Sequence, residues 1–403
     1  MKLFSYQNIY FVFFTLFVTS LSFSKALPNI FFIVLTILFI YDSIKNGFYS
    51  NKSNLIKRAI PLTALWIYLF FKSIINATLS NDIQIISRFL IIIILPFLLY
   101  NISRNKLFLM FITSAFIAML KALYNTIIFY SKNHFLPFEQ GEIINNILII
   151  DRPYLGFFCL IAAILCLYLS NEIINHKKKL IFLSIIFILF IILIAARLTV
   201  ISAIIVLFIY LFFYSKFSVF KKLLYISISL LMIFFVIITN SNLKKRLTTN
   251  LSVERFKYYD ARVDIWDCAY RQIKSDNFNV LFGLKGYVFI ENKLIECYKS
   301  KFDEDLKKRG WFVDSKFNSH NQFLDFYLVG GLIGLILFVV FVFYLVRTSI
   351  HNFYFFSIVL SLILFFLFEN VFHRQFGCYL IAIIVLIINT NSEKTIILIK
   401  EST

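Results

Sequence analysis

The chain has 403 residues, of which 60% are hydrophobic and only 15% are charged, and it contains 52 phenylalanines. No water-soluble fold needs that much apolar surface, so the composition excludes a soluble globular protein and indicates a polytopic membrane protein. The formal net charge of +19 does not indicate a nucleic-acid partner. Lysine and arginine sit mostly in short loops beside apolar runs, which is the pattern that orients membrane helices.

Apolar runs along the chain predict an all-α polytopic membrane protein with about twelve transmembrane helices and one large, partly helical loop that faces outward. The first run lacks a small-residue cleavage site, so we read it as a retained helix rather than a signal peptide. Several runs are shorter than the ~20 residues usually needed to cross a bilayer, and we expect tilting or local thinning there. The runs lie roughly at 9–24, 28–44, 59–75, 85–100, 107–130, 153–170, 180–196, 198–214, 223–239, 322–346, 353–369 and 375–389.

These runs divide the chain into three parts. Residues 1–239 carry helices one to nine, residues 240–321 form the large external loop, and residues 322–403 carry helices ten to twelve and a short cytoplasmic tail. Basic residues such as Lys177–Lys179 recur in alternate short loops, so both termini are expected in the cytoplasm. The large loop then faces outward, and its own basic charge is no objection because loops longer than ~60 residues cross largely regardless of charge.

The apolar stretch from Leu180 to Tyr214 has one charged residue, Arg197. A single helix of this length would run about 52 Å, against a hydrocarbon core of ~30 Å. We therefore expect two helices with Arg197 at an outward turn, although the turn lacks Gly, Pro or Asn. An arginine at this boundary either snorkels to the membrane surface or belongs to a functional site.

Two further outward features are noted before the large loop is considered. Residues 131–152 form a second outward segment, which ends at Arg152 before Pro153 opens the sixth helix. The five cysteines show no metal-binding spacing. Cys268 and Cys297 both fall in the large loop, where they either pair as a disulfide or remain two thiols.

The large loop has a helical pattern from Val253 to Asp276, with Arg262 and Trp266 one turn apart on the same face. Such a helix either lies in the membrane interface with tryptophan as its anchor, or presents Arg262 to an active site at the membrane surface. Gly283 and Gly286 break the pattern and indicate a turn or short strand. Residues 291–311 are charged and mixed, as in a solvated helix.

The loop ends in a polar stretch before the tenth helix. Asn318 or Ser319 is expected to cap that helix, with His320 in its first turn, where the helix dipole keeps the imidazole neutral. A neutral imidazole there could accept a proton from a hydroxyl, while the alternative is a structural histidine. At the outward junction of the last two helices, three charged or titratable residues are expected to pair with one another: Glu369, His373 and Arg374.

Three stretches together resemble the O-antigen ligase and O-antigen polymerase superfamily of bacterial envelope enzymes. They span roughly residues 190–345, and their order and spacing are more specific than any one alone. Lys285 and Ala196 depart from the family pattern, which bears on the subfamily rather than the class. The stretches are Ala195–Thr199, Ala261–Trp266 with Leu281–Gly286, and Ser319–Leu324 with Gly331–Gly334.

The resemblance implies an inverting, metal-independent glycosyltransferase on the outer face of the bacterial inner membrane, without a cofactor. It would move a glycan from an undecaprenyl-diphosphate donor to an acceptor hydroxyl. Arg197 and Arg262 would bind the diphosphate, because the arginine fork matches phosphate oxygens, and His320 would be the catalytic base. The secondary candidates are Trp266, Asn321 and Arg152.

The partners implied are the lipid-linked glycan, an acceptor, and the surrounding membrane lipids, with no nucleic acid. The acceptor would be a lipid A core sugar in a ligase, or another lipid-linked repeat unit in a polymerase, and we favour the ligase slightly. The alternative is a flippase or transporter of lipid-linked oligosaccharide. Transporters tend to have paired halves with broken helices and a site at mid-membrane, which this sequence does not indicate.

Overall fold

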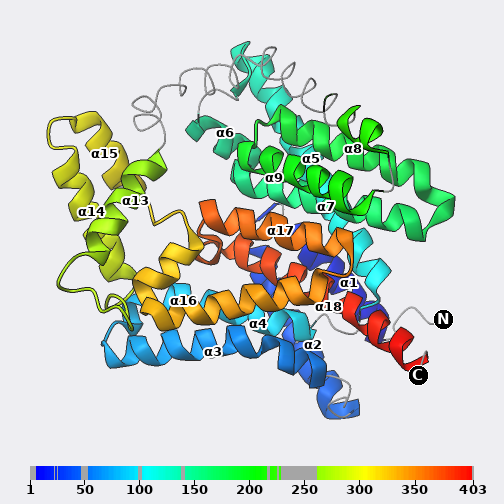
Figure 1. The fold of residues 1–403 in the computed structure, drawn as a ribbon, viewed down its shortest axis with the longest axis horizontal. Helices are drawn as coiled ribbons and strands as arrows, with labels where there is room; N and C mark the ends of the chain where they lie inside the picture. Colours follow the sequence, from blue (N-terminus) through cyan, green and yellow to red (C-terminus); the bar gives the residue numbers. More distant parts are fainter. Residues whose placement is uncertain are drawn as a thin grey trace.

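The computed structural model describes residues 6–46 except 22 and 25, then 53–98, 102–137, 141–215, 218–224, 227 and 261–401, and in these residues the chain is a bundle of helices (Figure 1). The helices before the large loop are α1 (Tyr6–Ser20), α2 (Leu27–Asn46), α3 (Ser53–Ile75), α4 (Leu79–Leu98), α5 (Arg104–Asn133), α6 (Gly141–Leu148), α7 (Arg152–Glu172), η3 (Ile174–His176), α8 (Lys177–Leu193), α9 (Arg197–Ile209) and η4 (Tyr210–Tyr214). Those that follow are α13 (Ala261–Ile273), α14 (Tyr287–Lys301), α15 (Leu306–Ser315), α16 (Gln322–Ser349), α17 (Phe353–Phe368), η5 (Val371–His373) and α18 (Gln375–Glu401).

The helices form in the predicted apolar runs, except that the run at 223–239 lies almost entirely outside the described residues. Six helices in the described part are long and apolar enough to cross a membrane, so twelve spans are not confirmed. Shorter apolar helices lie at Asn8–Ser20, Ala59–Ile75, Phe353–Phe368 and Gln375–Asn389. Apolar side chains on the outer faces are left exposed, as Ile37 (61%) and Ile44 (80%) in α2 are, which suits a lipid environment rather than water.

The long apolar stretch around Arg197 is two helices, as its length predicts. α8 ends at Leu193 and α9 begins at Arg197, and the reversal between them has Ala195 in the left-handed region at φ 52°. A residue with a Cβ atom takes that conformation at a cost of roughly 1–2 kcal/mol, and the sequence places no glycine there to avoid it. Ala195 and Ala196 are both buried, so packing around them stabilises the turn against the intrinsic backbone preference of alanine.

α16 is broken at Gly331, whose backbone is non-helical (φ 59°, ψ −155°). The loop between α13 and α14 fills the break: Leu332 N donates to Val280 O at 2.9 Å, and Leu284 N donates to Leu328 O at 2.8 Å. Lys72 Nζ from α3 donates to the Val329 and Leu284 carbonyls. Irregular backbone within a membrane protein needs such partners, so this loop and α16 fold as one piece.

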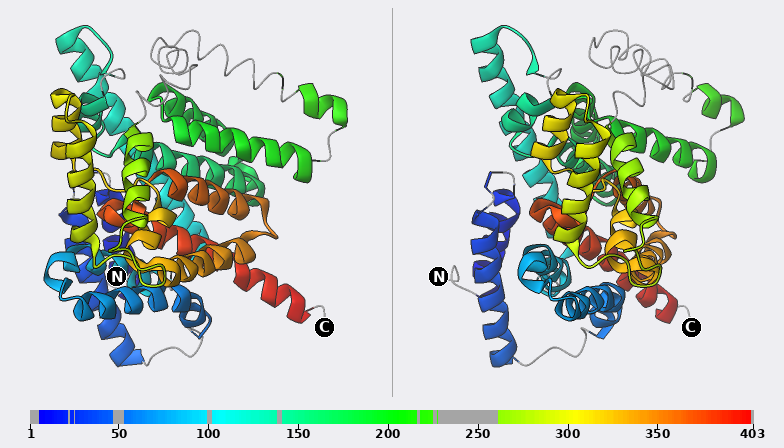
Figure 2. Two further views of the ribbon diagram at one scale, coloured as in Figure 1. Left: turned by 60° about the vertical axis from the view of Figure 1, so that its left-hand side comes forward. Right: turned by 90° about the vertical axis from the view of Figure 1, so that its left-hand side faces the viewer.

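The helices α13, α14 and α15 form a compact unit at one end of the bundle (Figures 1 and 2). Cys268 and Cys297 form a disulfide between α13 and α14. Asp264 bridges the unit, with Lys301 Nζ at 2.9 Å and Lys308 Nζ at 2.9 Å. The predicted single helix over 291–311 is therefore wrong, because a break at 302–305 lets α15 turn back and bring Lys308 to Asp264.

This unit is joined to the bundle through α4. Asp82, in the first turn of α4, accepts a hydrogen bond from Val288 N at 3.0 Å at the start of α14. At the other end of α4, the Leu98 carbonyl accepts from Tyr10 of α1. The beginning of α1 and the α13–α15 unit therefore lie at opposite ends of the bundle.

Candidate functional site

The candidate site lies where α13, the start of α16 and the end of α17 meet. α17 ends at Phe368, and Glu369 follows as its C-cap residue with an extended backbone. The Glu369 carboxylate is buried, and Arg262 NH2 of α13 forms an ion pair with it at 2.9 Å. Arg262 Nε also donates to the Phe368 carbonyl at 3.3 Å. The helix that carries Arg262 is thus joined to the end of α17 through Glu369, which the sequence analysis did not expect to pair with Arg262.

The same carboxylate faces His320. Nδ1 of His320 lies 3.5 Å from Glu369 Oε2, a long contact, and no closer hydrogen-bond partner meets this nitrogen among the described residues. Arg262 and His320 therefore converge on opposite oxygens of one carboxylate. This pair of contacts brings two of the three predicted site residues together.

The electrostatics of this trio favour an ionised Glu369. Burial alone would raise the pKa of the Glu369 carboxyl, but the neighbouring His320 and Arg262 outweigh burial and hold the pKa below its ordinary value. The side chains of Arg262 and His320 stay partly exposed, at 30% and 22%. The site is thus a buried negative charge with a cation and an imidazole at its open edge.

His320 precedes α16 rather than lying in its first turn, so that prediction was wrong. The N-cap is Asn321, whose Oδ1 accepts from Leu324 N at 3.0 Å. His320 has φ 45°, in the left-handed region, and its backbone N donates to Asn318 Oδ1 at 3.2 Å. The expected effect of the α16 dipole on His320 accordingly has no geometric basis. Asn321 has a capping role.

Trp266 holds the segment that carries His320. Its indole Nε1 donates to the Ser319 carbonyl at 3.0 Å, and its ring lies 6.2 Å from that of Phe368. Ile265 and Ala269, on the same helix, are fully buried. α13 therefore packs against protein on this face, and Trp266 contacts the segment that carries His320.

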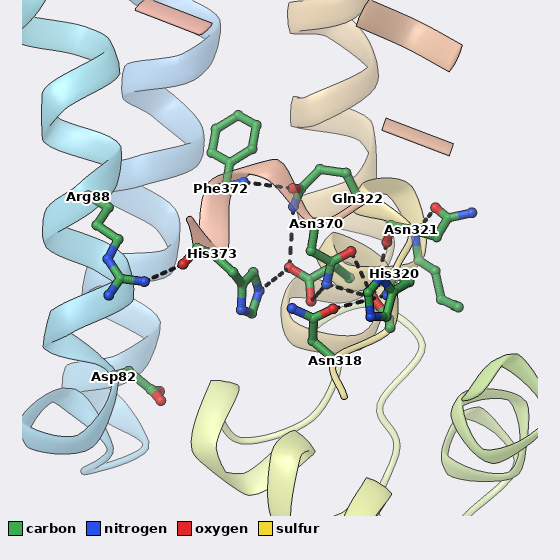
Figure 3. A network of polar contacts seen from close by, with 12 residues as sticks. Asp82, Arg88, Asn318, His320, Asn321, Gln322, Asn370, Phe372 and His373 are labelled. Atoms are coloured by element: carbon green, nitrogen blue, oxygen red, sulfur yellow. Dashed lines mark hydrogen bonds and ion pairs between the residues drawn. The ribbon is translucent and has the colours of Figure 1, made fainter. Parts of the chain in front are cut away.

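A second polar network is centred on Asp325 and includes Asn370 and His373, which lie beside His320 and Gln322 in Figure 3. Asp325 is buried in the first turn of α16, and His373 Nε2 lies 2.9 Å from its Oδ2. Asn370 Nδ2 lies within hydrogen-bond distance of Asp325 Oδ1 (3.1 Å) and of Ser319 Oγ (3.0 Å). Gln322 accepts from Phe372 N at 3.0 Å. This network fixes residues 369–373 against the segment that carries His320.

The expected mutual pairing of Glu369, His373 and Arg374 was wrong. Each finds another partner: Arg262 for Glu369, Asp325 for His373, and Asp151 at 3.4 Å for Arg374. Asp325 was missed. An acidic residue in an otherwise apolar helix was its signal, because an intramembrane carboxylate normally marks a partner or a function.

Arg197 and Arg152 lie at the same end of the bundle. The ring centroids of Tyr210 and Tyr214, just after the end of α9, lie 5.1 and 4.9 Å from that of Phe353 at the start of α17. The end of α9 therefore meets the start of α17, and the two helices run antiparallel. Arg197, at the other end of α9, is thereby brought toward the end of α17. Arg152 is buried at the start of α7, two residues before Tyr154, whose hydroxyl donates to the Asn370 carbonyl at 3.4 Å. Direct participation of Arg197 and Arg152 stays a prediction.

A sequence comparison finds a family model that matches part of the chain. Residues 182–339 match the family model described as O-antigen ligase. The matched region contains Arg197, Arg262 and His320, and it stops before Glu369. No curated protein matches the chain.

Proposed function

Because the chain belongs to the O-antigen ligase and O-antigen polymerase superfamily, a family of membrane glycosyltransferases, we propose that it transfers a glycan from an undecaprenyl-diphosphate donor to an acceptor hydroxyl during surface polysaccharide assembly. The observation that carries this proposal is the buried Glu369 carboxylate shared by Arg262 and His320. It joins a phosphate-binding group to a proton acceptor.

Arg262 is proposed to bind the donor diphosphate. Its guanidinium is partly exposed and is positioned by Glu369 and by the Phe368 carbonyl, and the planar guanidinium matches phosphate oxygens. Arg197, from the same end of the bundle, would supply a second fixed charge. Together they would stabilise the negative charge that develops on the departing diphosphate, and deleting such a group typically costs on the order of 10²–10³ in rate.

His320 is proposed to be the catalytic base. With Nδ1 turned to Glu369, the ring leaves Nε2 for the acceptor hydroxyl. The hydroxyl oxygen would attack the anomeric carbon, forming a new C–O bond as the C–O bond to the diphosphate breaks. The proton passes to His320, and the diphosphate leaves with the electron pair. Attack opposite to the leaving group inverts the anomeric centre. The left-handed backbone of His320 supports a functional role, because strained residues cluster at active sites.

The external face of the bacterial inner membrane is the proposed location. The Cys268–Cys297 disulfide supports this, because disulfides persist outside the reducing cytoplasm. The proposed chemistry uses arginine charge and one imidazole, without a metal ion or cofactor. A lipid A core sugar or a lipid-linked repeat unit would be the acceptor.

A flippase has less support. The break in α16 is a feature that transporters share, but here the loop before α14 fills it and pins it to α3. Nothing else in the described residues favours a transport path.

The proposal is tested in cells that lack the native gene and express Arg262→Gln, with Arg271→Gln as the matched control. Arg271 is an exposed arginine on the same helix, where it pairs with Asp267. We expect Arg262→Gln to abolish mature polysaccharide and to accumulate lipid-linked glycan on the outer face at normal protein levels. Accumulation on the inner face would instead identify a flippase, and normal polysaccharide would contradict the proposal.

A further inference from the structure

Arg88 is a charged residue well inside the apolar helix α4, about 14 Å along the axis from Leu79. Its guanidinium is half-buried and donates to the His373 carbonyl. Within the described part of the chain, no carboxylate lies within ion-pair distance of Arg88. An arginine at such a position is costly and marks a functional site by default.

Arg374 brings a second guanidinium to the same place. The carbonyl that accepts from Arg88 belongs to the peptide bond between His373 and Arg374, so the Arg88 guanidinium adjoins the Arg374 backbone. The Arg374 side chain is 60% exposed and makes one long contact, 3.4 Å, with Asp151. Two guanidinium groups, of which only Arg374 has a carboxylate partner among the described residues and that one at 3.4 Å, form a positive cluster that an anion would neutralise.

Arg88 and His320 lie on opposite sides of His373 and Asn370 (Figure 3). His373 binds Asp325 on one side, while Asn370 binds it on the other and also binds Ser319, the residue before His320. The Arg88–Arg374 pair and the Arg262–Glu369–His320 trio therefore share one rigid framework without sharing a residue. Such a framework fixes the spacing between two anionic groups.

We infer that Arg88 and Arg374 bind the diphosphate of the acceptor, a second lipid-linked glycan, across the Asp325 network from the donor. This rests on the proposed function and narrows it, because only a polymerase-type reaction uses two lipid-linked diphosphates. An exposed arginine and a half-buried arginine at a helix junction suit a phosphate that arrives from the bilayer, since guanidinium groups bind phosphate oxygens bidentately.

Phospholipid headgroups offer the same phosphate chemistry, so the test must separate the two sources. The full-length protein is placed in nanodiscs of phosphatidylcholine, and undecaprenyl diphosphate is added. Bound copies are counted by native mass spectrometry. We expect two copies on the wild-type protein, and one copy on Arg88→Gln and on Arg374→Gln at concentrations that fill both wild-type sites. Each substitution removes a charge-assisted contact and should weaken that site by about tenfold or more.

Arg374→Gln is the control for folding, because the Arg374 side chain is 60% exposed and its ion pair with Asp151 is long, at 3.4 Å. Arg88→Lys keeps a donor for the His373 carbonyl, and it should retain the fold while binding the second copy more weakly. Arg271→Gln is the control and should bind two copies. Two copies on Arg374→Gln, with wild-type affinity, would overturn the inference.

A second arm adds phosphatidylglycerol in competition. If phosphatidylglycerol displaces the copy that depends on Arg88 at equal concentration, the site is a phospholipid site and the inference is overturned. We expect no displacement. Arg262→Gln should remove the other copy, so failure of the donor site and failure of the acceptor site give different results.

Discussion

The guanidinium of Arg262 and the carboxylate of Glu369 form a 2.9 Å ion pair between residues 107 positions apart in the chain. A diphosphate that draws Arg262 toward it must compete with this pair. When Arg262 turns to phosphate, Glu369 is left to His320, whose Nδ1 already faces it at 3.5 Å. Donor binding and orientation of the base would thus be coupled through one side chain.

Substitution of Glu369 by glutamine tests that coupling. Glu369→Gln keeps the side-chain volume but removes the negative charge. Arg262 then loses its ion pair, and His320 loses the carboxylate that its Nδ1 faces. We expect the transfer rate to fall on the order of 10²-fold, since a positioned base contributes about that much or more. The measurement is glycan transfer by purified protein, with Glu172→Gln, which loses a carboxylate paired to Arg104, as control. An unchanged rate in Glu369→Gln would show that the carboxylate has no part in catalysis.

Acid should weaken this trio in a defined direction. The folded protein holds the pKa of Glu369 below its ordinary value of 4.5, because His320 and Arg262 outweigh the effect of burial. Its contribution to the free energy of unfolding is therefore fully present above pH 4.5 and is lost as the pH falls through the lowered pKa. We expect the Tm difference between wild-type protein and Glu369→Gln to stay constant from pH 8 to about pH 5, then to shrink. If the Tm difference between the two proteins grew on acidification, the expected stabilisation by ionised Glu369 would be contradicted.

Local sequence pattern predicted much of the fold and part of the candidate site. Length alone required two helices around Arg197, and helical spacing placed Arg262 and Trp266 on one face. The roles of Glu369 and Asp325 could not be predicted, because each depends on partners from other helices, and spacing does not report which distant segments meet. The position of His320 was misjudged because the helix start lies two or three residues later than predicted, and several neighbouring polar residues could all serve as the cap.

The break in α16 was also beyond sequence reasoning. Gly331 and Gly334 could lie in a regular membrane helix, and only the insertion of residues 279–285 from elsewhere shows why the helix opens. The local apolar pattern favours an unbroken helix at this position. The break is instead stabilised by hydrogen bonds from residues 279–285 to α16.

Gly331→Ala tests how much that insertion matters. The new Cβ would overlap the Leu281 backbone, and Gly331 already has φ +59°, so two penalties add. We expect the Tm of the purified protein to fall by several degrees, or the protein to fail to accumulate. Gly310→Ala is the matched control, because nothing lies within 4 Å of its added Cβ. Equal stability of the two variants would mean that the loop and α16 do not fold as one piece.

The disulfide gives a test of sidedness. Cys268 and Cys297 should resist a membrane-impermeant maleimide on intact cells, after the outer membrane is opened, because they are paired. Treatment with an impermeant reductant should expose them, whereas Cys159, buried in α7, should stay unreactive. Reductant-dependent labelling supports an external α13–α15 unit. Labelling without reductant would contradict the disulfide, and labelling only after lysis of the inner membrane would contradict the external position.

Glycan transfer by purified protein carrying His320→Ala, with defined undecaprenyl-diphosphate donor and acceptor, addresses the catalytic site most directly. His351→Ala, an exposed histidine between α16 and α17, is the control. The predicted result is a rate 10²–10⁴-fold lower for His320→Ala, with donor binding retained and the His351→Ala rate unchanged. Transfer by His320→Ala at the wild-type rate would contradict a site built on Arg262, Glu369 and His320.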